Sequence, residues 1–272
     1  MRKVALVTGS TRGIGQATAI ALAQKGFDIV VTGRTLKEGT GTVHAPNRGS
    51  VPVPGSIEST VAAVRECGRD ALGVRLDILD RASIDAALKT VLDTWGHIDV
   101  LVNNAIYQGP GLLDAFADCT TDQATGAMTG TFINQLHITR EVLKGMVAKG
   151  SGMFFFIGSV AGIHAPTLMP GKGGWSILHS ATKSAFHRIP EFLNLEHGKD
   201  GIQAFLVEPQ MTVTETIKAI FGNRGESLGV EGHEPAVTGE VIAWLATRPE
   251  AREYLGTFIS TPDFHAAHVA TG

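Results

Sequence analysis

Apolar residues in this chain gather in short runs that are separated by segments with helical spacing. Seven runs have the length of buried strands and are rich in Val, Ile and Phe. They cover residues 4–7, 27–32, 71–76, 98–102, 153–157, 202–207 and 257–260. The run at 153–157, Met-Phe-Phe-Phe-Ile, contains no polar position. We therefore expect it to be buried on both faces of a sheet.

Apolar positions between these runs repeat at the spacing of amphipathic helices. Asp80 is a suitable N-cap, Gly26 a suitable left-handed C-cap, and Pro190 predicts a kink inside the helix that contains it. Helices are predicted over 14–25, 56–67, 80–95, 121–149, 178–197 and 234–247, with interruptions at Gly126 and Gly130. Strands that alternate with helices predict a single-domain, doubly wound parallel α/β sheet with helices on both faces.

Three segments fall outside this alternation. Residues 36–55 are rich in Gly, Pro and Thr, so we interpret them as a long loop. Regions around 160–178 and 210–235 are interpreted as substrate lids or loops of the same domain, which spans residues 1–272.

A glycine-rich turn joins the first strand to the first helix. Gly9, Gly13 and Gly15 stand where the apolar run ends and the helix begins. Backbone N–H groups at a helix N-terminus lack partners inside the helix, and glycines allow a phosphate to approach them. The turn could be an ordinary strand-to-helix corner, but the pattern favours a pyrophosphate site.

Residues with turn or ligand chemistry follow directly after six of the predicted strands. They are Gly9, Arg34, Asp77, Asn103, Ser159 and Pro209. The carboxyl ends of parallel strands lie at one edge of a sheet, and ligands bind at that edge in open α/β folds. Together with the glycine turn, these positions predict a nucleotide site.

The second strand ends in Arg34, where a dinucleotide would place its adenosine ribose. A carboxylate there would pair with a free 2′-hydroxyl, whereas a guanidinium pairs with a 2′-phosphate. Arg34, with Arg12 in the glycine turn, therefore favours NADP over NAD. The alternative is that Arg34 is simply a solvated side chain.

Composition narrows the classes of partner. The 272 residues are 43% hydrophobic, carry a net charge of −3 and contain no basic run, which argues against nucleic acid as a partner. The N-terminal apolar run is too short for a signal peptide or a membrane anchor. Cys67 and Cys119 lack metal-ligand spacing, and we expect no metal site and a reducing, cytoplasmic environment.

The motifs above resemble those of the short-chain dehydrogenase/reductase family over about residues 3–260. The matching segments are residues 8–15, Asp77, Asn103-Asn104-Ala105 and Glu208-Pro209-Gln210 with Thr214; Ile106 and Gln210 replace two of the family's glycines. The resemblance implies a Rossmann-type fold and a pyridine dinucleotide. The cofactor-binding residues that it and the turn indicate are Gly9, Ser10, Thr11, Arg12, Gly13, Ile14, Gly15, Arg34, Asp77, Ile78, Asn103, Ala105, Lys183, Pro209 and Thr214.

The catalytic motif matches the family only in part. Ser159 corresponds to the serine that holds the substrate carbonyl, and Lys183 to the family's lysine, which binds the nicotinamide ribose. Lys183 could instead be an ordinary lysine on a helix surface. His179 stands where the family has its tyrosine, and Thr131 where it has a helix asparagine. Tyr107, or water held by Thr131, is an alternative proton donor.

The lysine has opposite effects on tyrosine and histidine. A nearby ammonium favours a phenolate, but it disfavours an imidazolium and so lowers the pKa of His179. A neutral His179 is handicapped as an acid in carbonyl reduction and less so as a base in alcohol oxidation. His179 could instead be a packed residue in a site without hydride chemistry.

These observations predict an NADP(H)-dependent oxidoreductase for a carbonyl/alcohol pair with an atypical acid/base residue. The alternative is a nucleotide-binding protein of the same fold without redox turnover, such as a sensor, an assembly partner or a non-redox catalyst. Apolar residues at 163–178 suggest an apolar small-molecule substrate, but they could equally pack against another subunit. The resemblance implies a homotetramer or homodimer.

Overall fold

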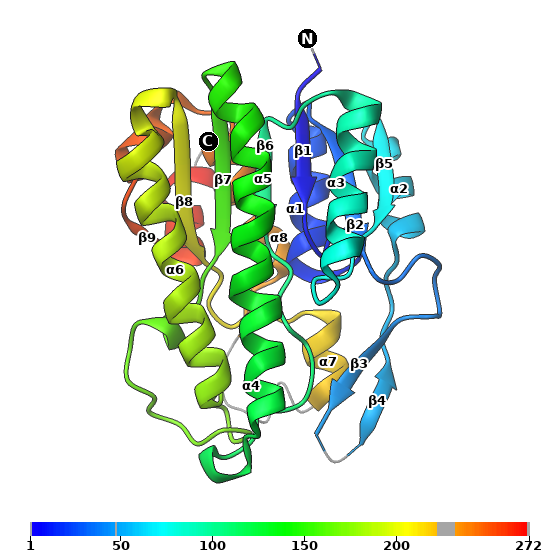
Figure 1. Cartoon of the computed structure of the whole chain (residues 1–272), viewed down its shortest axis with the longest axis vertical. Coiled ribbons are helices and arrows are strands. Elements are labelled where there is room, and N and C mark those ends of the chain that lie inside the picture. Colours follow the sequence, from blue (N-terminus) through cyan, green and yellow to red (C-terminus); the bar gives the residue numbers. More distant parts are fainter. Residues whose placement is uncertain (1, 47, 222–231, 271–272) are drawn as a thin grey trace.

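The computed structural model describes residues 2–46, 48–221 and 232–270. Its centre is a seven-stranded parallel sheet in the order β5-β2-β1-β6-β7-β8-β9. The strands are β1 (Val4–Val7), β2 (Asp28–Gly33), β5 (Ala71–Arg75), β6 (Val100–Asn103), β7 (Gly152–Ile157), β8 (Ile202–Glu208) and β9 (Phe258–Ser260). The predicted strands and the doubly wound α/β class are confirmed. All seven carboxyl ends lie at one edge, the lower edge in Figure 1.

Helices cover both faces of the sheet, and each face has its own apolar core. One layer holds α1 (Gly13–Gln24), α2 (Ile57–Glu66) and α8 (Pro235–Leu245); the other holds α3 (Arg81–Trp95), α5 (Asn134–Lys149) and α6 (Ile177–His197). Phe155 packs in the first core, and Phe154 and Phe156 pack in the second. The apolar run of β7 is therefore buried on both faces, as its sequence predicts.

The helix boundaries follow the capping signals of the sequence. Asp80 accepts hydrogen bonds from Ala82 N and Ser83 N, and Gly26 has a φ of 93° after α1. Pro190 lies inside α6, which continues past it. The predicted helix at 121–149 is divided into α4 (Thr121–Met128), a π-helical turn (Thr129–Ile133) and α5.

The interpretation of residues 36–55 as a long loop was wrong. Within this segment, β3 (Thr42–Ala45) and β4 (Gly49–Pro52) form an antiparallel hairpin, which packs against α7 (Glu215–Phe221) (Figure 1). An isolated two-stranded hairpin is marginally stable in water. The hairpin depends on burial of Val43 and Ala45, which its glycine-rich sequence does not reveal.

The two predicted lid regions have different structures. After Ser159, a 3-10 turn (Val160–Gly162) leads into a loop that carries a bridge between Pro170 and Gly174. The region 210–235 contains α7, but its residues 222–231 lie outside the described part of the chain. Among the described residues, no helix combines the length and the hydropathy needed to cross a bilayer.

Candidate active site

The glycine turn (residues 8–15) has a conformation that only glycine accommodates easily. Gly9 and Gly13 have φ values of 66° and 55°, in the left-handed region. A Cβ atom at Gly15 would collide with the carbonyl oxygen of Gly9 and lie 2.5 Å from Nδ2 of Asn104. The first turn of α1 therefore packs directly against the backbone of the turn.

Thr8 and Asn104 tie this turn to the end of β6. Nδ2 of Asn104 donates to the carbonyl oxygens of Thr8 (2.8 Å) and Gly9 (3.0 Å). Oγ1 of Thr8 accepts the N–H groups of Asn104 and Ala105 and donates to the carbonyl oxygen of Val102. Both residues lie in the predicted motifs, but this structural role results from the adjacency of β1 and β6, which the sequence alone does not show.

The end of β2 presents two arginines in different environments. Arg34 is exposed. Arg12 is partly buried, and its guanidinium donates to the carbonyl oxygens of Pro54 (2.7 Å) and Gly55 (2.9 Å) and to Oγ1 of Thr35 (3.2 Å). Arg34 is thus the more available of the two for an anionic ligand.

The loop after β5 holds the next predicted residues. Oδ1 of Asp77 accepts the N–H of Leu79, which closes a local turn, and Ile78 is buried between them. Asn103, at the end of β6, is also buried; its Nδ2 donates to Oγ1 of Thr139, and its Oδ1 has no partner among the described residues. The predicted Asp77, Ile78 and Asn103 therefore lie at the same edge as the glycine turn.

The segment after β8 is in contact with the glycine turn. Pro209 is buried, and Gln210 has a φ of 53°, so this substitution for a glycine is held in a left-handed conformation. Nε2 of Gln210 donates to Oγ of Ser260 at 2.8 Å. Farther along, a Cβ at Gly13 would lie 3.1 Å from Cγ2 of Thr214. Residues about 200 positions apart are therefore in contact at the turn.

Ser159 and Lys183 meet at the end of β7. Nζ of Lys183 donates to the carbonyl oxygen of Ile157 at 2.5 Å. Burial lowers the pKa of Lys183 to about 8, and the charge of Glu208 opposes part of that shift. Oγ of Ser159 accepts the N–H of Ala161 at 3.2 Å. Within the described part of the chain, the hydroxyl proton of Ser159 and two protons of a charged Lys183 have no acceptor, so they are available for a ligand.

His179 is buried one helical turn before Lys183, and its ring stacks on that of Trp175 with centroids 4.3 Å apart. Burial, followed by the charges of Lys183 and His187, lowers the pKa of His179 to about 3. The sequence argument anticipated the direction of this shift from Lys183, but burial is the larger cause. At neutral pH the imidazole is uncharged.

The two alternative proton donors have partners of their own. Thr131 lies in the π-helical turn, and its Oγ1 accepts the N–H of Tyr107 at 3.2 Å. The hydroxyl of Tyr107 donates to the carbonyl oxygen of Pro110 at 3.1 Å, and burial, followed by Asp114, raises its pKa. Tyr107 would have to leave Pro110 before it could act on a substrate.

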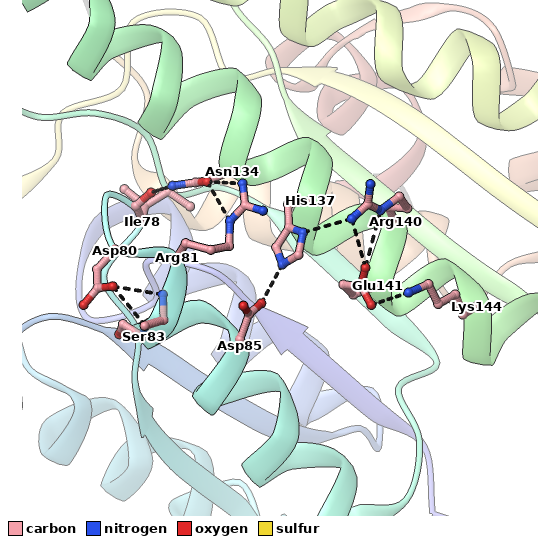
Figure 2. Close-up of polar contacts among 11 residues, drawn as sticks. Ile78, Asp80, Arg81, Ser83, Asp85, Asn134, His137, Arg140, Glu141 and Lys144 are labelled. Atoms are coloured by element: carbon pink, nitrogen blue, oxygen red, sulfur yellow. Dashed lines mark hydrogen bonds and ion pairs between the residues drawn. The ribbon is translucent and has the colours of Figure 1, made fainter.

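Asn134, the nearest asparagine to Thr131 along this helix, is not available to replace the helix asparagine that the resemblance implies at position 131. Its Nδ2 donates to the carbonyl oxygen of Ile78 at 2.7 Å, and its Oδ1 accepts from the guanidinium of Arg81. Figure 2 shows these contacts beside the hydrogen bond between His137 and Asp85, which also joins α5 to α3. Asn134 therefore links two helices and the loop after β5.

Two further polar residues at this site had no role assigned from the sequence, although Glu208 lies in one of the matching segments. Nε2 of His187 accepts the N–H of Ser159 at 3.1 Å, so the neutral ring carries its proton on Nδ1. Burial, then Lys183 and Arg188, lower the pKa of His187 to about 4. Glu208 is buried behind Lys183; its Oε1 accepts the N–H of Gln210, and burial raises its pKa.

The site fits a dinucleotide. The glycine turn offers backbone N–H groups at a helix N-terminus, and adjacent buried atoms such as Oδ1 of Asn103 lack a partner within the described residues. Lys183 has unused donors at the other end of the same sheet edge. The glycine turn thus provides a place for an anion, Asn103 a polar group beside it, and Lys183 a buried ammonium beyond.

Comparisons with known proteins agree with this geometry. A family model described as short chain dehydrogenase matches residues 3–54 and 50–225. An uncharacterized oxidoreductase of Staphylococcus epidermidis is 29% identical over 226 residues, which are 82% of this chain and 84% of the relative. A 3-oxoacyl-(acyl-carrier-protein) reductase of Vibrio harveyi is 30% identical over 219 residues, 80% of this chain and 77% of the relative.

Solved structures share the fold. The crystal structure of gox2181 has a TM-score of 0.78 at 21% identity and covers 95% of this chain and 93% of its own. A 3-oxoacyl-(acyl-carrier protein) reductase from Brucella melitensis, solved in complex with NAD, has a TM-score of 0.77 at 24% identity, with 96% of each chain covered.

Proposed function

This chain belongs to the short-chain dehydrogenase/reductase family and is an oxidoreductase of that type, and from this premise we propose that it uses NADP(H) on a carbonyl/alcohol pair. The observation that carries the proposal is the convergence of the glycine turn, Ser159 and Lys183 at one edge of the sheet. A nicotinamide bound there supplies or accepts the hydride. The protein's own residues bind, orient and move the proton.

In this proposal the glycine turn and Thr214 hold the diphosphate, and Lys183 holds the nicotinamide ribose. Ser159 donates its free hydroxyl proton to the substrate oxygen, because its Oγ already accepts from Ala161. His179 has the atypical acid/base role. Because its pKa is about 3, the imidazole is uncharged at neutral pH, so it is not charged to act as an acid in carbonyl reduction and is only a weak base in alcohol oxidation.

The specificity for NADP is a proposal supported by Arg34. It is exposed at the end of β2, where a guanidinium would pair with a 2′-phosphate. Replacing Arg34 with Leu is expected to weaken NADP⁺ binding about tenfold and to leave NAD⁺ binding unchanged, because only NADP⁺ has that phosphate. Isothermal titration calorimetry with both nucleotides measures this difference.

Lys37→Leu is the matched control, since Lys37 is an exposed cation three residues away. If Arg34→Leu weakened the binding of NADP⁺ and NAD⁺ equally, the assignment to NADP would be contradicted. No heat with either nucleotide in the unmodified protein would contradict the whole proposal. Tight binding without turnover on ketones, aldehydes or alcohols would instead support a nucleotide-binding protein that lacks redox activity.

We assign His187 as a positioning residue for Ser159. A Cβ at Gly158 would lie 3.1 Å from Nε2 of His187, and one at Gly162 would lie 2.7 Å from Cε1, so both glycines make room for its ring. The imidazole then fixes the backbone of Ser159 through the accepted N–H. The hydroxyl of Ser159 is oriented as a result.

His187→Phe is expected to lower kcat/KM about tenfold without changing NADP⁺ affinity, because it removes the acceptor and keeps a ring. His187→Gln returns an acceptor and should restore most of the loss. Amide hydrogen exchange at Ser159 should be fast in the Phe variant and slow in the Gln variant. Equal exchange in both variants would contradict the positioning role.

Substrate and assembly are also proposals. Exposed apolar side chains follow Ser159, at Ile163, Leu168 and Met169, and they support an apolar small-molecule substrate. Others lie on α6, where Phe192 and Leu195 are 55% and 80% exposed. These support a homodimer or homotetramer, because exposed apolar residues on one element are typical of interfaces.

A further inference from the structure

The glycine turn is in contact with an anion of the protein's own. The N–H of Gly13, in the first turn of α1, donates to Oε2 of Glu215 at 2.9 Å. The N–H groups of a first helical turn have no partners inside the helix, and a negative charge stabilises them. These are the donors that a diphosphate would use in the proposed function. A carboxylate and a diphosphate are both negatively charged, so they compete for this place.

Helix α7, which begins at Glu215, is held at its other end by the hairpin of β3 and β4. The guanidinium of Arg48 donates to the carbonyl oxygens of Ala219, at 2.7 Å, and Ile220. These carbonyls belong to the last turn of α7, where a cation is favourable. The strands pack against the same helix. The hairpin thus secures α7 from outside the main sheet.

The base of the hairpin returns to the glycine turn. Arg12, the residue before α1, donates from Nε and Nη2 to the carbonyl oxygens of Pro54 and Gly55. Contacts therefore run from the turn through Arg12 to the hairpin, through Arg48 to α7, and through Glu215 back to Gly13. These contacts link the hairpin, α7 and the glycine turn in a closed circuit.

We infer that Glu215 is an internal competitor of the cofactor diphosphate and that the hairpin holds α7 in the competing position. This inference rests on the proposed function of the same site. A dinucleotide displaces Glu215 from Gly13, and the displacement releases the start of α7. Only molecules in which Glu215 has left the turn can bind the dinucleotide. The apparent affinity is therefore the intrinsic affinity multiplied by the fraction of such molecules.

Glu215→Gln tests the competition, because glutamine has nearly the same shape without the charge. Its dissociation constant for NADP⁺ is expected to be about tenfold lower than that of the unmodified protein. Glu196→Gln, an exposed change on α6, removes the same charge elsewhere and should have no effect. Calorimetric titration of both variants with NADP⁺ and with inorganic diphosphate measures the difference. Equal or weaker binding of both ligands to Glu215→Gln overturns the inference.

Arg48→Ala tests the hairpin. It should tighten NADP⁺ binding about threefold when Glu215 is present and have no effect in the Glu215→Gln background, since the helix then no longer competes. Equal effects in both backgrounds would contradict the role of the hairpin.

Failure of the proposed function has a different signature. If Glu215→Gln binds inorganic diphosphate more tightly while neither protein binds NADP⁺, the competitor role stands and the dinucleotide function fails. If NADP⁺ binds equally to the unmodified protein and to Glu215→Gln, and amide exchange at Gly13 is the same in the two ligand-free proteins, the competitor role fails and the proposed function stands.

Discussion

His179→Tyr is expected to raise NADPH-dependent carbonyl reduction at pH 7 by about tenfold or more. Burial and the charge of Lys183 keep His179 uncharged, so it is a poor proton donor. The same Lys183 would favour ionisation of a phenol at this position and make it a usable acid and base. General acid–base catalysis contributes about 10²–10⁴-fold to a rate, which leaves room for such a gain. Initial rates over a panel of ketones and aldehydes measure it.

His179→Phe is the control, because it keeps an aromatic ring against Trp175 and removes both ring nitrogens. We expect NADP⁺ affinity to be unchanged in both variants. With a pKa of about 3, His179 should not introduce an ionisation into the rate profile between about pH 5 and 8. A large fall in activity on His179→Tyr would show instead that the histidine has a chemical role that a phenol cannot replace.

Gly15→Ala is expected to weaken dinucleotide binding by at least about 100-fold, equivalent to about 2.7 kcal/mol. The new Cβ would collide with the Gly9 carbonyl and with Asn104 Nδ2. Relief of that collision requires the start of α1 to move away from the turn, which separates the phosphate-binding N–H groups from the end of β6. Calorimetry with NADP⁺ and thermal unfolding together measure the loss.

Gly145→Ala provides the comparison, because Gly145 is an exposed position of α5 with open space around its Cβ. It should leave binding unchanged and stabilise the protein by about 0.5–1 kcal/mol, as alanine does in a helix interior. If Gly15→Ala behaved in the same way, the glycine turn would not be the diphosphate site.

Sequence and structure contributed differently to what is known of the residues around Ser159 and Lys183. The histidine at position 179 and the threonine at position 131, where the resemblance implies a tyrosine and an asparagine, were visible in the sequence because both are statements about residue identity. The relative size of the causes that lower the pKa of His179 was not visible in the sequence. Burial exceeds Lys183 as the cause of the low pKa of His179, and burial depends on how Trp175 and α6 pack. His187 likewise had no signal, since its contact with Ser159 joins positions 28 residues apart.

The sequence by itself determined the strands, most helix boundaries and the residues at the carboxyl edge of the sheet, because apolar periodicity, capping residues and glycine turns act over a few neighbouring positions. Tertiary structure alone decided the hairpin of residues 42–52, the placement of α7 on it, and the bond between Gly13 and Glu215. Those features depend on contacts between segments as many as 202 positions apart. No local pattern encodes such contacts, because the residues that make them become neighbours only when the sheet has formed.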